Sequence, residues 1–319
     1  MRVLITGGAG FIGSNLAIKL LQDPEIELVV VLDNLSNGHY SNLKPFENDP
    51  KLQFIEGDIR NQADCDKACS LVDVISHQAA LGSVPRSVKD PFTSFEVNVM
   101  GTINLMNAAV NHNITRIVLA CSSSTYGDNI SLPKIESNTG NPLSPYAVTK
   151  ATLEQIAFAW QKCFGLEYVG LRYFNIFGPL QYSNNPYAAV IPIFINSALN
   201  DQPIYINGDG FTSRDFTYVD NAVDANILAL KTKEKDSVNQ IYNVACNERI
   251  SLNELHAKLE LIFNKKIHKK HREERPGDVK HSLADISKIK KGLNYNVITD
   301  FDQGLINTVK WHEKLKNLS

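Results

Sequence analysis

The sequence contains no uninterrupted run of 18 apolar residues, so it predicts no transmembrane helix. It also lacks a basic N-terminal segment followed by an apolar stretch, because Gly7 and Gly8 interrupt the first apolar run. Neither sign of charge dominates, since the formal net charge is −2. The basic run Lys265–Arg275 is a local exception, but two glutamates interrupt it, which is typical of a solvated surface. We therefore expect a cytoplasmic protein with neither nucleic acid nor a membrane as a partner.

Cysteine is scarce, and its spacing excludes the common cysteine-based sites. The five cysteines form no C-x-x-C pair and show no zinc-ligand spacing. An odd number of cysteines in such a chain is typical of reduced thiols in a cytosol. We therefore predict no metal site.

Short runs rich in Val, Ile and Leu alternate with helix-like segments through the first 175 residues. Such continuous apolar strands are typical of a sheet covered on both faces, which predicts an α/β fold with a doubly wound parallel sheet. The strands are placed at Arg2–Thr6, Leu28–Asp33, Gln53–Glu56, Val74–Ser76, Arg116–Ala120 and Tyr168–Arg172. The helices are placed at Ser14–Gln22, Asn61–Ser70, Ser94–Asn111 and Ser144–Cys163.

After Asn175 the alternation weakens, and Pro, Gly and Asn become more frequent. We therefore expect a sheet domain over residues 1–175 and a smaller, irregular C-terminal lobe over 176–319. Some segments of that lobe should return to the sheet domain.

A glycine-rich turn, TGGAGFIG from Thr6 to Gly13, follows the first strand directly and leads into a helix. Glycines at this point let backbone amides approach a pyrophosphate, and the helix N-terminus adds partial positive charge. The context of strand, turn and helix predicts a dinucleotide-binding (Rossmann) turn rather than a purely structural one. Its candidate contacts are Gly7, Gly10, Phe11, Ile12 and Gly13.

Asp33 ends the second strand, 20 residues beyond Gly13. A carboxylate there accepts hydrogen bonds from the adenosine ribose and repels a 2′-phosphate, so we expect NAD rather than NADP. Asn34 should lie beside it.

Two further strand ends should border the cofactor. Asp58 and Ile59 follow the third strand, although a loop aspartate can equally be a helix cap. The segment Ala79–Ser83, which contains Ala80 and Gly82, follows the fourth strand and should lie at the carboxyl edge of the sheet.

Tyr146 and Lys150 lie four residues apart, one helical turn, in SPYAVTK. Ser144 can cap the helix and Pro145 can occupy its first position, so the tyrosine and lysine should share a face. A nearby ammonium can lower the pKa of the phenol and make it a usable base. The same spacing occurs by chance in many helices, so the assignment depends on the other motifs.

The fifth strand closes on Ser122, Ser123 and Ser124, which places hydroxyls at the carboxyl edge. Serines at strand ends are often turn formers. One of them could instead orient a substrate hydroxyl for Tyr146.

The glycine turn, the strand-end serines and the Y-x-x-x-K pair together resemble the extended short-chain dehydrogenase/reductase family, specifically its nucleotide-sugar 4-epimerases. The resemblance covers nearly the whole chain. It continues through LRYFNIFGP from Leu171, NGDG from Asn207, RDF from Arg214 and RPGD from Arg275.

The resemblance implies a hydride shuttle on bound NAD. Tyr146 would take the sugar 4-hydroxyl proton, assisted by Ser122, while the C4 hydride passes to the nicotinamide. Lys150 would hold the nicotinamide ribose and favour the phenolate. The 4-keto sugar would rotate and take the hydride back on its other face, which inverts C4 without net redox change. Dehydratases and decarboxylases of the family carry acids where this chain has Ser123 and Ser124, so plain epimerisation is favoured.

The resemblance also implies the residues that hold the substrate. Arg214 and Arg275 would grip the diphosphate, Asn175 would hydrogen-bond it, and Asp278 would lie near the uridine ribose. The remaining expected substrate contacts are Gly82, Ser83, Ser123, Ser124, Ala189, Val190, Tyr205, Asn207 and Ser282.

A small residue at Ser282 resembles the epimerase branch that prefers N-acetylated UDP-hexoses, so we expect UDP-N-acetylglucosamine and UDP-N-acetylgalactosamine as the substrate pair. UDP-glucose, or a UDP-N-acetylhexosaminuronic acid facing Arg86, remains an alternative. A net NAD-dependent dehydrogenase or reductase would use the same residues, and a non-catalytic NAD sensor on this fold would lack the Tyr or the Lys. The resemblance further implies a homodimer through the helices at Ser94–Asn111 and Ser144–Cys163.

Overall fold

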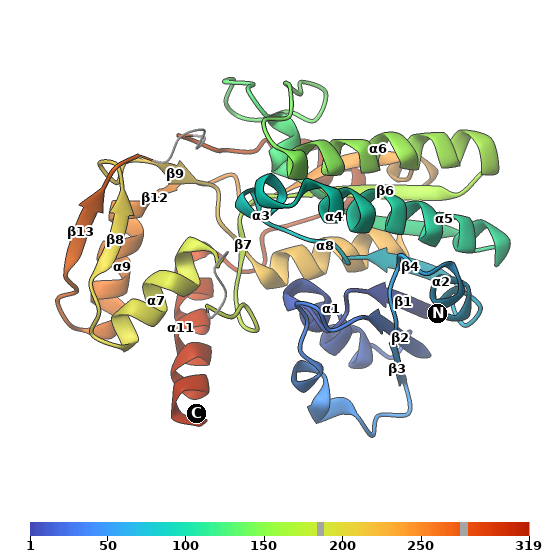
Figure 1. Ribbon diagram of the computed structural model, residues 1–319, viewed down its shortest axis with the longest axis horizontal. Helices are drawn as coiled ribbons and strands as arrows, with labels where there is room; N and C mark the ends of the chain where they lie inside the picture. The colour runs from blue at the N-terminus through green and yellow to red at the C-terminus, as the bar shows by residue number, and fades with distance from the viewer. Residues whose placement is uncertain (184–187, 275–279, 319) are drawn as a thin grey trace.

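The computed structural model describes residues 1–183, 188–274 and 280–318. Seven parallel strands form one sheet in the order β11-β6-β5-β4-β1-β2-β3 (Figure 1). They are β1 (Arg2–Thr6), β2 (Leu28–Asp33), β3 (Leu52–Glu56), β4 (Val74–His77), β5 (Arg116–Ser122), β6 (Glu167–Tyr173) and β11 (Gln240–Val244). The α/β fold with a parallel sheet is therefore confirmed.

Helices cover both faces of this sheet, which explains why the inner strands β1 and β2 are almost entirely apolar and buried. Val3 and Ile5 of β1 join a buried cluster with residues of α1 (Phe11–Leu21) and α8 (Val219–Lys231). Leu4, between them, points to the other face and joins a cluster with α2 (Gln62–Cys69), α5 (Gly101–Asn111) and α6 (Pro145–Phe164). We call this sheet with its covering helices the sheet lobe.

A second group of elements gathers on the left of Figure 1 as a small lobe, with β8 (Ile204–Asn207), β13 (Lys269–Arg272), α7 (Val190–Leu199), α9 (Leu252–Phe263) and α11 (Phe301–Leu318). Its centre is a two-stranded parallel sheet, β8 with β13. Two short strand pairs, β7 (Ile176–Phe177) with β10 (Thr217–Tyr218) and β9 (Ser213–Arg214) with β12 (Ile250–Ser251), connect it to the rest.

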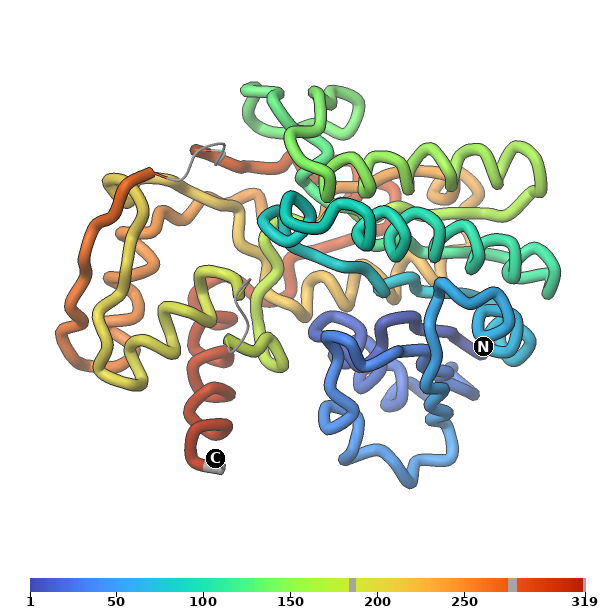
Figure 2. Tube along the Cα trace, in the orientation of Figure 1, coloured from blue at the N-terminus to red at the C-terminus, as the bar shows by residue number. Residues whose placement is uncertain are grey.

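The chain passes between the two lobes several times (Figure 2). After β10 it returns to the sheet lobe as α8 and β11, then enters the small lobe, and comes back as α10 (Ser287–Leu293), which packs against β11. The sequence did not predict β11 as a strand, because five residues without alternation carry little signal and only the pairing with β6 makes them a strand.

The helix predicted over Ser94–Asn111 is present, but it begins at Pro91 and contains a π turn. It consists of α4 (Pro91–Phe95), one π-helical turn over Glu96–Met100, and α5. The helix begins earlier because Asp90 caps it, its carboxylate accepting the Thr93 N–H at 3.1 Å. The extra residue of a π turn re-aims side chains, and such turns are frequent at functional sites.

The other predicted boundaries shift by smaller amounts. α1 begins at Phe11 rather than Ser14, because Gly10 already serves as the N-cap. A short helix, α3 (Val84–Lys89), follows β4 and was not predicted. Among the described residues, no helix is both long and apolar enough to cross a membrane.

Candidate active site

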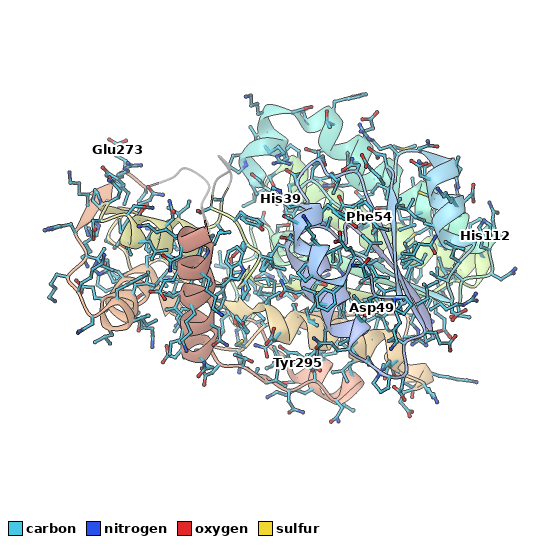
Figure 3. The ribbon with its side chains drawn as sticks, turned by 90° about the horizontal axis from the view of Figure 1, so that it is seen from below. His39, Asp49, Phe54, His112, Glu273 and Tyr295 are labelled. Carbon is cyan, nitrogen blue, oxygen red and sulfur yellow. The ribbon has the colours of Figure 1, made fainter. Side chains whose placement is uncertain are left out.

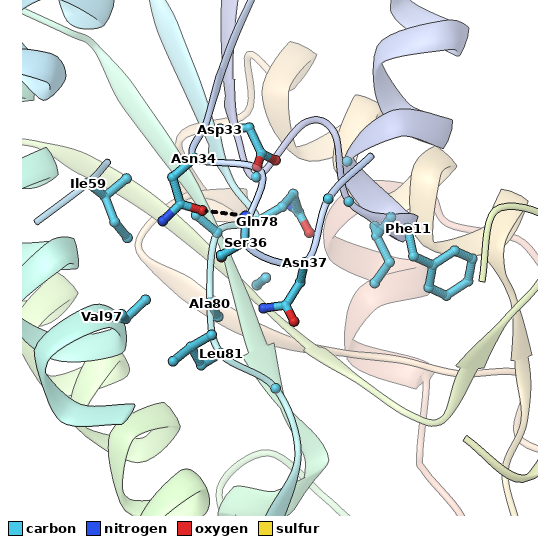
Figure 4. Close-up of a pocket in the computed structure, with 18 of the residues that line it drawn as sticks. Phe11, Asp33, Asn34, Ser36, Asn37, Ile59, Gln78, Ala80, Leu81 and Val97 are labelled. Atoms are coloured by element: carbon cyan, nitrogen blue, oxygen red, sulfur yellow. Dashed lines mark hydrogen bonds between the residues drawn. The ribbon is translucent and has the colours of Figure 1, made fainter. Parts of the chain in front are cut away.

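A cavity of about 760 Å³ opens at the carboxyl edge of the sheet, where β1, β2, β4 and β5 end (Figure 4). This size suits a small-molecule cofactor. The catalytic candidate Tyr146 lines it, and so does every residue that the sequence predicts to bind the cofactor: Gly7, Gly10, Phe11, Ile12, Gly13, Asp33, Asn34, Asp58, Ile59, Ala79, Ala80 and Lys150.

The glycine turn is too tight for side chains. A Cβ on Gly13 would lie 2.2 Å from the carbonyl oxygen of Gly7, and a Cβ on Gly7 would lie 2.7 Å from the backbone of Ala79. Gly7 also has φ +68°, which favours glycine. Gly10 caps α1 without a side-chain hydrogen bond, so the first amides of the helix face the cavity. This cradle of free N–H groups fits the diphosphate of a dinucleotide.

Asp33 fastens the turn while facing the cavity. Its carboxylate accepts the N–H of Ala9 at 2.9 Å and that of Leu35 at 2.8 Å. Burial raises the pKa of Asp33, and these two hydrogen bonds oppose that shift. Each oxygen keeps a free lone pair, so the carboxylate can still accept from a ribose hydroxyl.

Asp58 belongs to a charged cluster and is not a helix cap. Its carboxylate pairs with Arg60 at 2.8 Å and accepts from Asn34 Nδ2 at 2.8 Å. These partners, with Arg60 first, lower the pKa of Asp58 to about 2. The cap of α2 is Asn61 instead. Asn34 in turn accepts the N–H of Ser36 at 3.1 Å, which shapes the loop at this end of the cavity (Figure 4).

The helix that carries the catalytic pair begins as its sequence predicts. Ser144 Oγ accepts the N–H of Ala147 at 3.1 Å, and Pro145 occupies the first helical position. Lys150 is buried, which lowers its pKa to about 8, and its Nζ donates to Ala120 O at 2.7 Å.

The effect of Lys150 on the pKa of the phenol stays a prediction. Burial raises the pKa of Tyr146, and the group that opposes this shift is Ser122, through a side-chain hydrogen bond. The Lys150 ammonium donates to the Ala120 carbonyl, next to Cys121 and Ser122 at the end of β5. Ser122, at the end of β5, is therefore the side chain that opposes the raised pKa of the phenol.

Ser123 and Ser124, which follow Ser122, lie in the turn after β5. Ser122 Oγ accepts the N–H of Ser124 at 3.1 Å and so ends the strand. Ser124 Oγ is buried without a hydrogen-bond partner among the described residues. A buried hydroxyl costs about 1–3 kcal/mol when unpaired, so a bound ligand that reaches it would be stabilised.

Two contacts that the sequence did not reveal fasten the catalytic helix to the cofactor cavity. Ser87 Oγ, on α3, accepts the backbone N–H of Tyr146 at 3.0 Å. Asn98, in the π turn, accepts the N–H of Leu81 at 2.7 Å and donates to Thr149 Oγ1 at 3.1 Å. The π turn therefore holds the segment after β4 against α6.

Gln78 and Tyr173 also line the cavity and were missed. Tyr173 OH donates to Gln78 Oε1 at 3.1 Å and accepts from Asn226 Nδ2 at 2.7 Å. Both residues stand at strand ends, as Ser122 does, so the same rule could have found them. Leu81, within the predicted segment Ala79–Ser83, and Arg86 line the cavity too. The other missed lining residues are Leu32, Ser36, Asn37, Gly38, Gly57, Arg60, Thr93, Val97, Ala120 and Cys121.

Three predicted substrate residues meet in the small lobe around Asp215. Asn175 Nδ2 donates to Asp215 O at 3.0 Å and to Ser282 Oγ at 3.3 Å. Arg214, the neighbour of Asp215, donates to the carbonyls of Ser213 and Lys280. Asn175 has φ +41°, a conformation that is sparsely populated outside glycine and clusters at functional sites.

The other predicted substrate residues are spread more widely. Gly82 lines the cavity, and Ser83 caps α3 with φ +95°. Ala189 caps α7, which begins at Val190, while Tyr205 and Asn207 lie on β8. Ser83, Ser123, Ser124, Asn175, Ala189, Val190, Tyr205, Asn207, Arg214 and Ser282 are not among the described residues that line the cavity. Arg275 and Asp278 lie outside the described residues.

The model of the NAD dependent epimerase/dehydratase family matches residues 3–245 of the chain. The chain belongs to this family. A putative UDP-glucose 4-epimerase of Methanocaldococcus jannaschii is 37% identical over 315 residues, 97% of either chain. The solved UDP-N-acetylglucosamine 4-epimerase from Methanobrevibacter ruminantium M1, in complex with UDP-N-acetylmuramic acid, is 40% identical with a TM-score of 0.92 over 98% of each chain.

A third relative in the family carries the cofactor. The UDP-glucuronic acid 4-epimerase from Bacillus cereus, in complex with UDP-glucuronic acid and NAD, is 32% identical with a TM-score of 0.92 over 99% of this chain and 100% of that one. Together with the glycine cradle, these similarities show that the protein is an NAD-dependent nucleotide-sugar 4-epimerase. Within the described residues, no group of three or more His, Cys, Asp or Glu side chains could hold a metal ion.

Proposed function

We propose that the epimerase interconverts UDP-N-acetylglucosamine and UDP-N-acetylgalactosamine through a transient 4-keto sugar. The observation that carries the proposal is that Tyr146 and Lys150 both line the cofactor cavity. The small side chain of Ser282, beside Asn175 in the small lobe, supports the choice of an acetylated sugar.

In the proposed reaction, Tyr146 removes the proton of the sugar 4-hydroxyl and later returns it. Ser122, which opposes the raised pKa of the phenol, would assist this proton transfer. Lys150, buried with a pKa near 8, supplies positive charge at the same end of the cavity. The glycine cradle and Asp33 would hold NAD, which would supply the acceptor and donor of the C4 hydride.

Elimination of water is disfavoured, because the residues at the end of β5 are serines. A dehydratase needs an acid that protonates a leaving hydroxyl. Ser123 and Ser124 follow Ser122 in this chain, and neither is an acid at physiological pH. Plain epimerisation therefore remains the supported reaction.

The substrate assignment has two alternatives, UDP-glucose and a UDP-N-acetylhexosaminuronic acid. The relative with 40% identity is named for UDP-N-acetylglucosamine, which supports the acetylated sugar. Arg86 is the residue that could face a uronic carboxylate. It lines the cofactor cavity and donates to Asn37 Oδ1 at 3.0 Å, and Asn37 lines the same cavity. This contact gives the uronic acid no additional support.

The proposal is tested by incubating the purified enzyme with UDP-N-acetylglucosamine without added cofactor. Proton NMR follows the configuration at C4, and absorbance follows NADH. We expect the galacto epimer to accumulate without net NADH. Steady NADH release would instead establish a dehydrogenase. Turnover of UDP-glucose alone, or of a UDP-N-acetylhexosaminuronic acid alone, would show that this sugar is the substrate in place of UDP-N-acetylglucosamine.

Ser282→Tyr is expected to lower kcat/KM for UDP-N-acetylglucosamine at least about 10-fold more than for UDP-glucose, because a bulky ring occupies the space of the acetamido group. The measurement compares kcat/KM for both sugars. Ser282→Ala is the matched control, since it removes the hydroxyl that accepts from Asn175 and adds no bulk. An unchanged ratio of the two constants in Ser282→Tyr would remove Ser282 from the specificity argument.

We also infer a homodimer formed through the outer faces of α4 to α6. Phe95, Met100, Val148 and Phe158 are large apolar side chains on these elements, each between 37% and 52% exposed. Phe158→Glu is expected to convert the dimer into a monomer, which sedimentation analysis would detect as a fall in molecular mass from two chains to one. Leu261→Glu is the control, because Leu261 is 81% exposed on α9 of the small lobe, and it should leave the mass unchanged. A wild-type monomer would refute the dimer.

A further inference from the structure

The loop Gly178–Tyr182 is tied to the cofactor cradle by two hydrogen bonds that cross between the lobes. Asn15 Nδ2, on α1, donates to Pro179 O at 3.0 Å. Tyr182 OH donates to Asn42 Oδ1 at 2.8 Å, in the loop after β2. This loop follows Asn175 and β7 along the chain and leads towards α7, so it lies between two groups of predicted substrate residues.

Both partners of this loop also hold the glycine turn. Asn42 Nδ2 donates to Ala9 O at 3.0 Å, and the same carbonyl accepts the N–H of His39 at 2.9 Å. Asn15 Nδ2 also donates to Phe11 O at 2.8 Å, at the start of α1. Each asparagine therefore touches the phosphate cradle on one side and the crossing loop on the other.

Aromatic contacts of Tyr182 link the loop after β2 to the small lobe. The ring of Tyr182 lies edge-on to His39 at 4.7 Å and to Trp311 at 5.3 Å between centroids. Trp311 is on α11, which packs against α7, the helix that begins at Val190. His39 is labelled at the boundary between the lobes in Figure 3.

The crossing loop is held in a conformation that its neighbours must stabilise. Leu180 has φ +68°, which costs a leucine of order 1 kcal/mol and persists only where the surroundings fix it. Gln181 Nε2 donates to Ile176 O at 3.2 Å, while its Oε1 is buried without a partner among the described residues. The contacts of Tyr182 and Pro179 are therefore part of what holds the loop in place.

From these contacts we propose that Tyr182 is a positioning residue through which nucleotide-sugar binding in the small lobe slows the loss of NAD from the sheet lobe. The proposal rests on the proposed function for its second ligand. Its physical basis is that one segment contacts the surroundings of both sites. A ligand at one site that orders this segment lowers the entropic cost that the ligand at the other site would otherwise bear for ordering it.

The test measures exchange of bound NAD for deuterium-labelled NAD in the holoenzyme by mass spectrometry, with and without saturating UDP. Tyr182→Phe keeps the ring beside His39 and Trp311 and deletes only the hydroxyl that reaches Asn42. In the wild type we expect UDP to slow exchange. In Tyr182→Phe the slowing should shrink by about threefold to tenfold, the size of one neutral hydrogen bond.

Two further variants separate coupling from general damage. Tyr40→Phe is the matched control, since Tyr40 lies in the same loop as Asn42 and its ring packs on Phe54, and it should leave the UDP effect unchanged. Asn15→Ala cuts the second link and should reduce the UDP effect further when combined with Tyr182→Phe.

Calorimetric titration with UDP distinguishes the possible failures. UDP binding with an equal slowing of exchange in wild type and Tyr182→Phe would overturn the role of Tyr182. Absence of any UDP effect in the wild type would overturn the coupling itself. No UDP binding by any variant would overturn the proposed function, and this inference with it.

Discussion

Replacement of Tyr146 by phenylalanine is expected to lower turnover at least about 100-fold, the usual minimum contribution of a positioned acid or base. The phenol of Tyr146 lines the cavity, and phenylalanine removes its hydroxyl while keeping the ring. UDP binding should persist, because Arg214, a predicted diphosphate contact, lies on β9 and not in the cofactor cavity. Turnover by NMR and UDP affinity by calorimetry measure the two effects separately.

The control for this result is a tyrosine outside the cavity. Tyr40→Phe removes a hydroxyl from a ring that packs on Phe54, and we expect wild-type turnover. Near-wild-type turnover in Tyr146→Phe would show that another group moves the proton. A loss of UDP binding equal to the loss of turnover would show that Tyr146 acts on binding instead.

Gly13→Ala is expected to weaken NAD binding by about 5-fold to 150-fold, which corresponds to the roughly 1–3 kcal/mol of an overpacked site. The new Cβ would lie 2.2 Å from the carbonyl oxygen of Gly7, and backbone on both sides must shift to admit it. That shift moves the amides that face the cavity at the start of α1. The NAD content of the purified protein and its affinity for added NAD provide the measurement.

A second glycine distinguishes NAD loss from general instability. Gly165 ends α6 with φ +75°, and a Cβ there would meet open space. Gly165→Ala should therefore lower the melting temperature through backbone strain while NAD is retained. Full NAD content in Gly13→Ala would contradict the role given to the turn.

Local patterns predicted the parts of the site that are built from neighbouring residues. The strands Arg2–Thr6 and Leu28–Asp33 have the predicted bounds, and the glycine turn between them borders the predicted cavity. The cap of α6 by Ser144 was equally local. These features depend on propensity and spacing, which a sequence displays directly.

Features that depend on distant contacts could not be predicted. The Lys150 ammonium donates to the carbonyl of Ala120, 30 residues earlier. The cluster around Asp215 joins Asn175 with Ser282, and those two residues are 107 positions apart. Side-chain direction at such places follows from packing that no local pattern contains.

The return of α8 and β11 to the sheet lobe limits how this fold can be rebuilt. Because the small lobe is assembled from segments that alternate with sheet-lobe segments along the chain, it cannot be exchanged as one cassette for the lobe of a relative. Ending the chain after β6 would leave that strand as an open edge, a template for aggregation. New substrate preferences are therefore more accessible through single substitutions around the site than through recombination of whole modules.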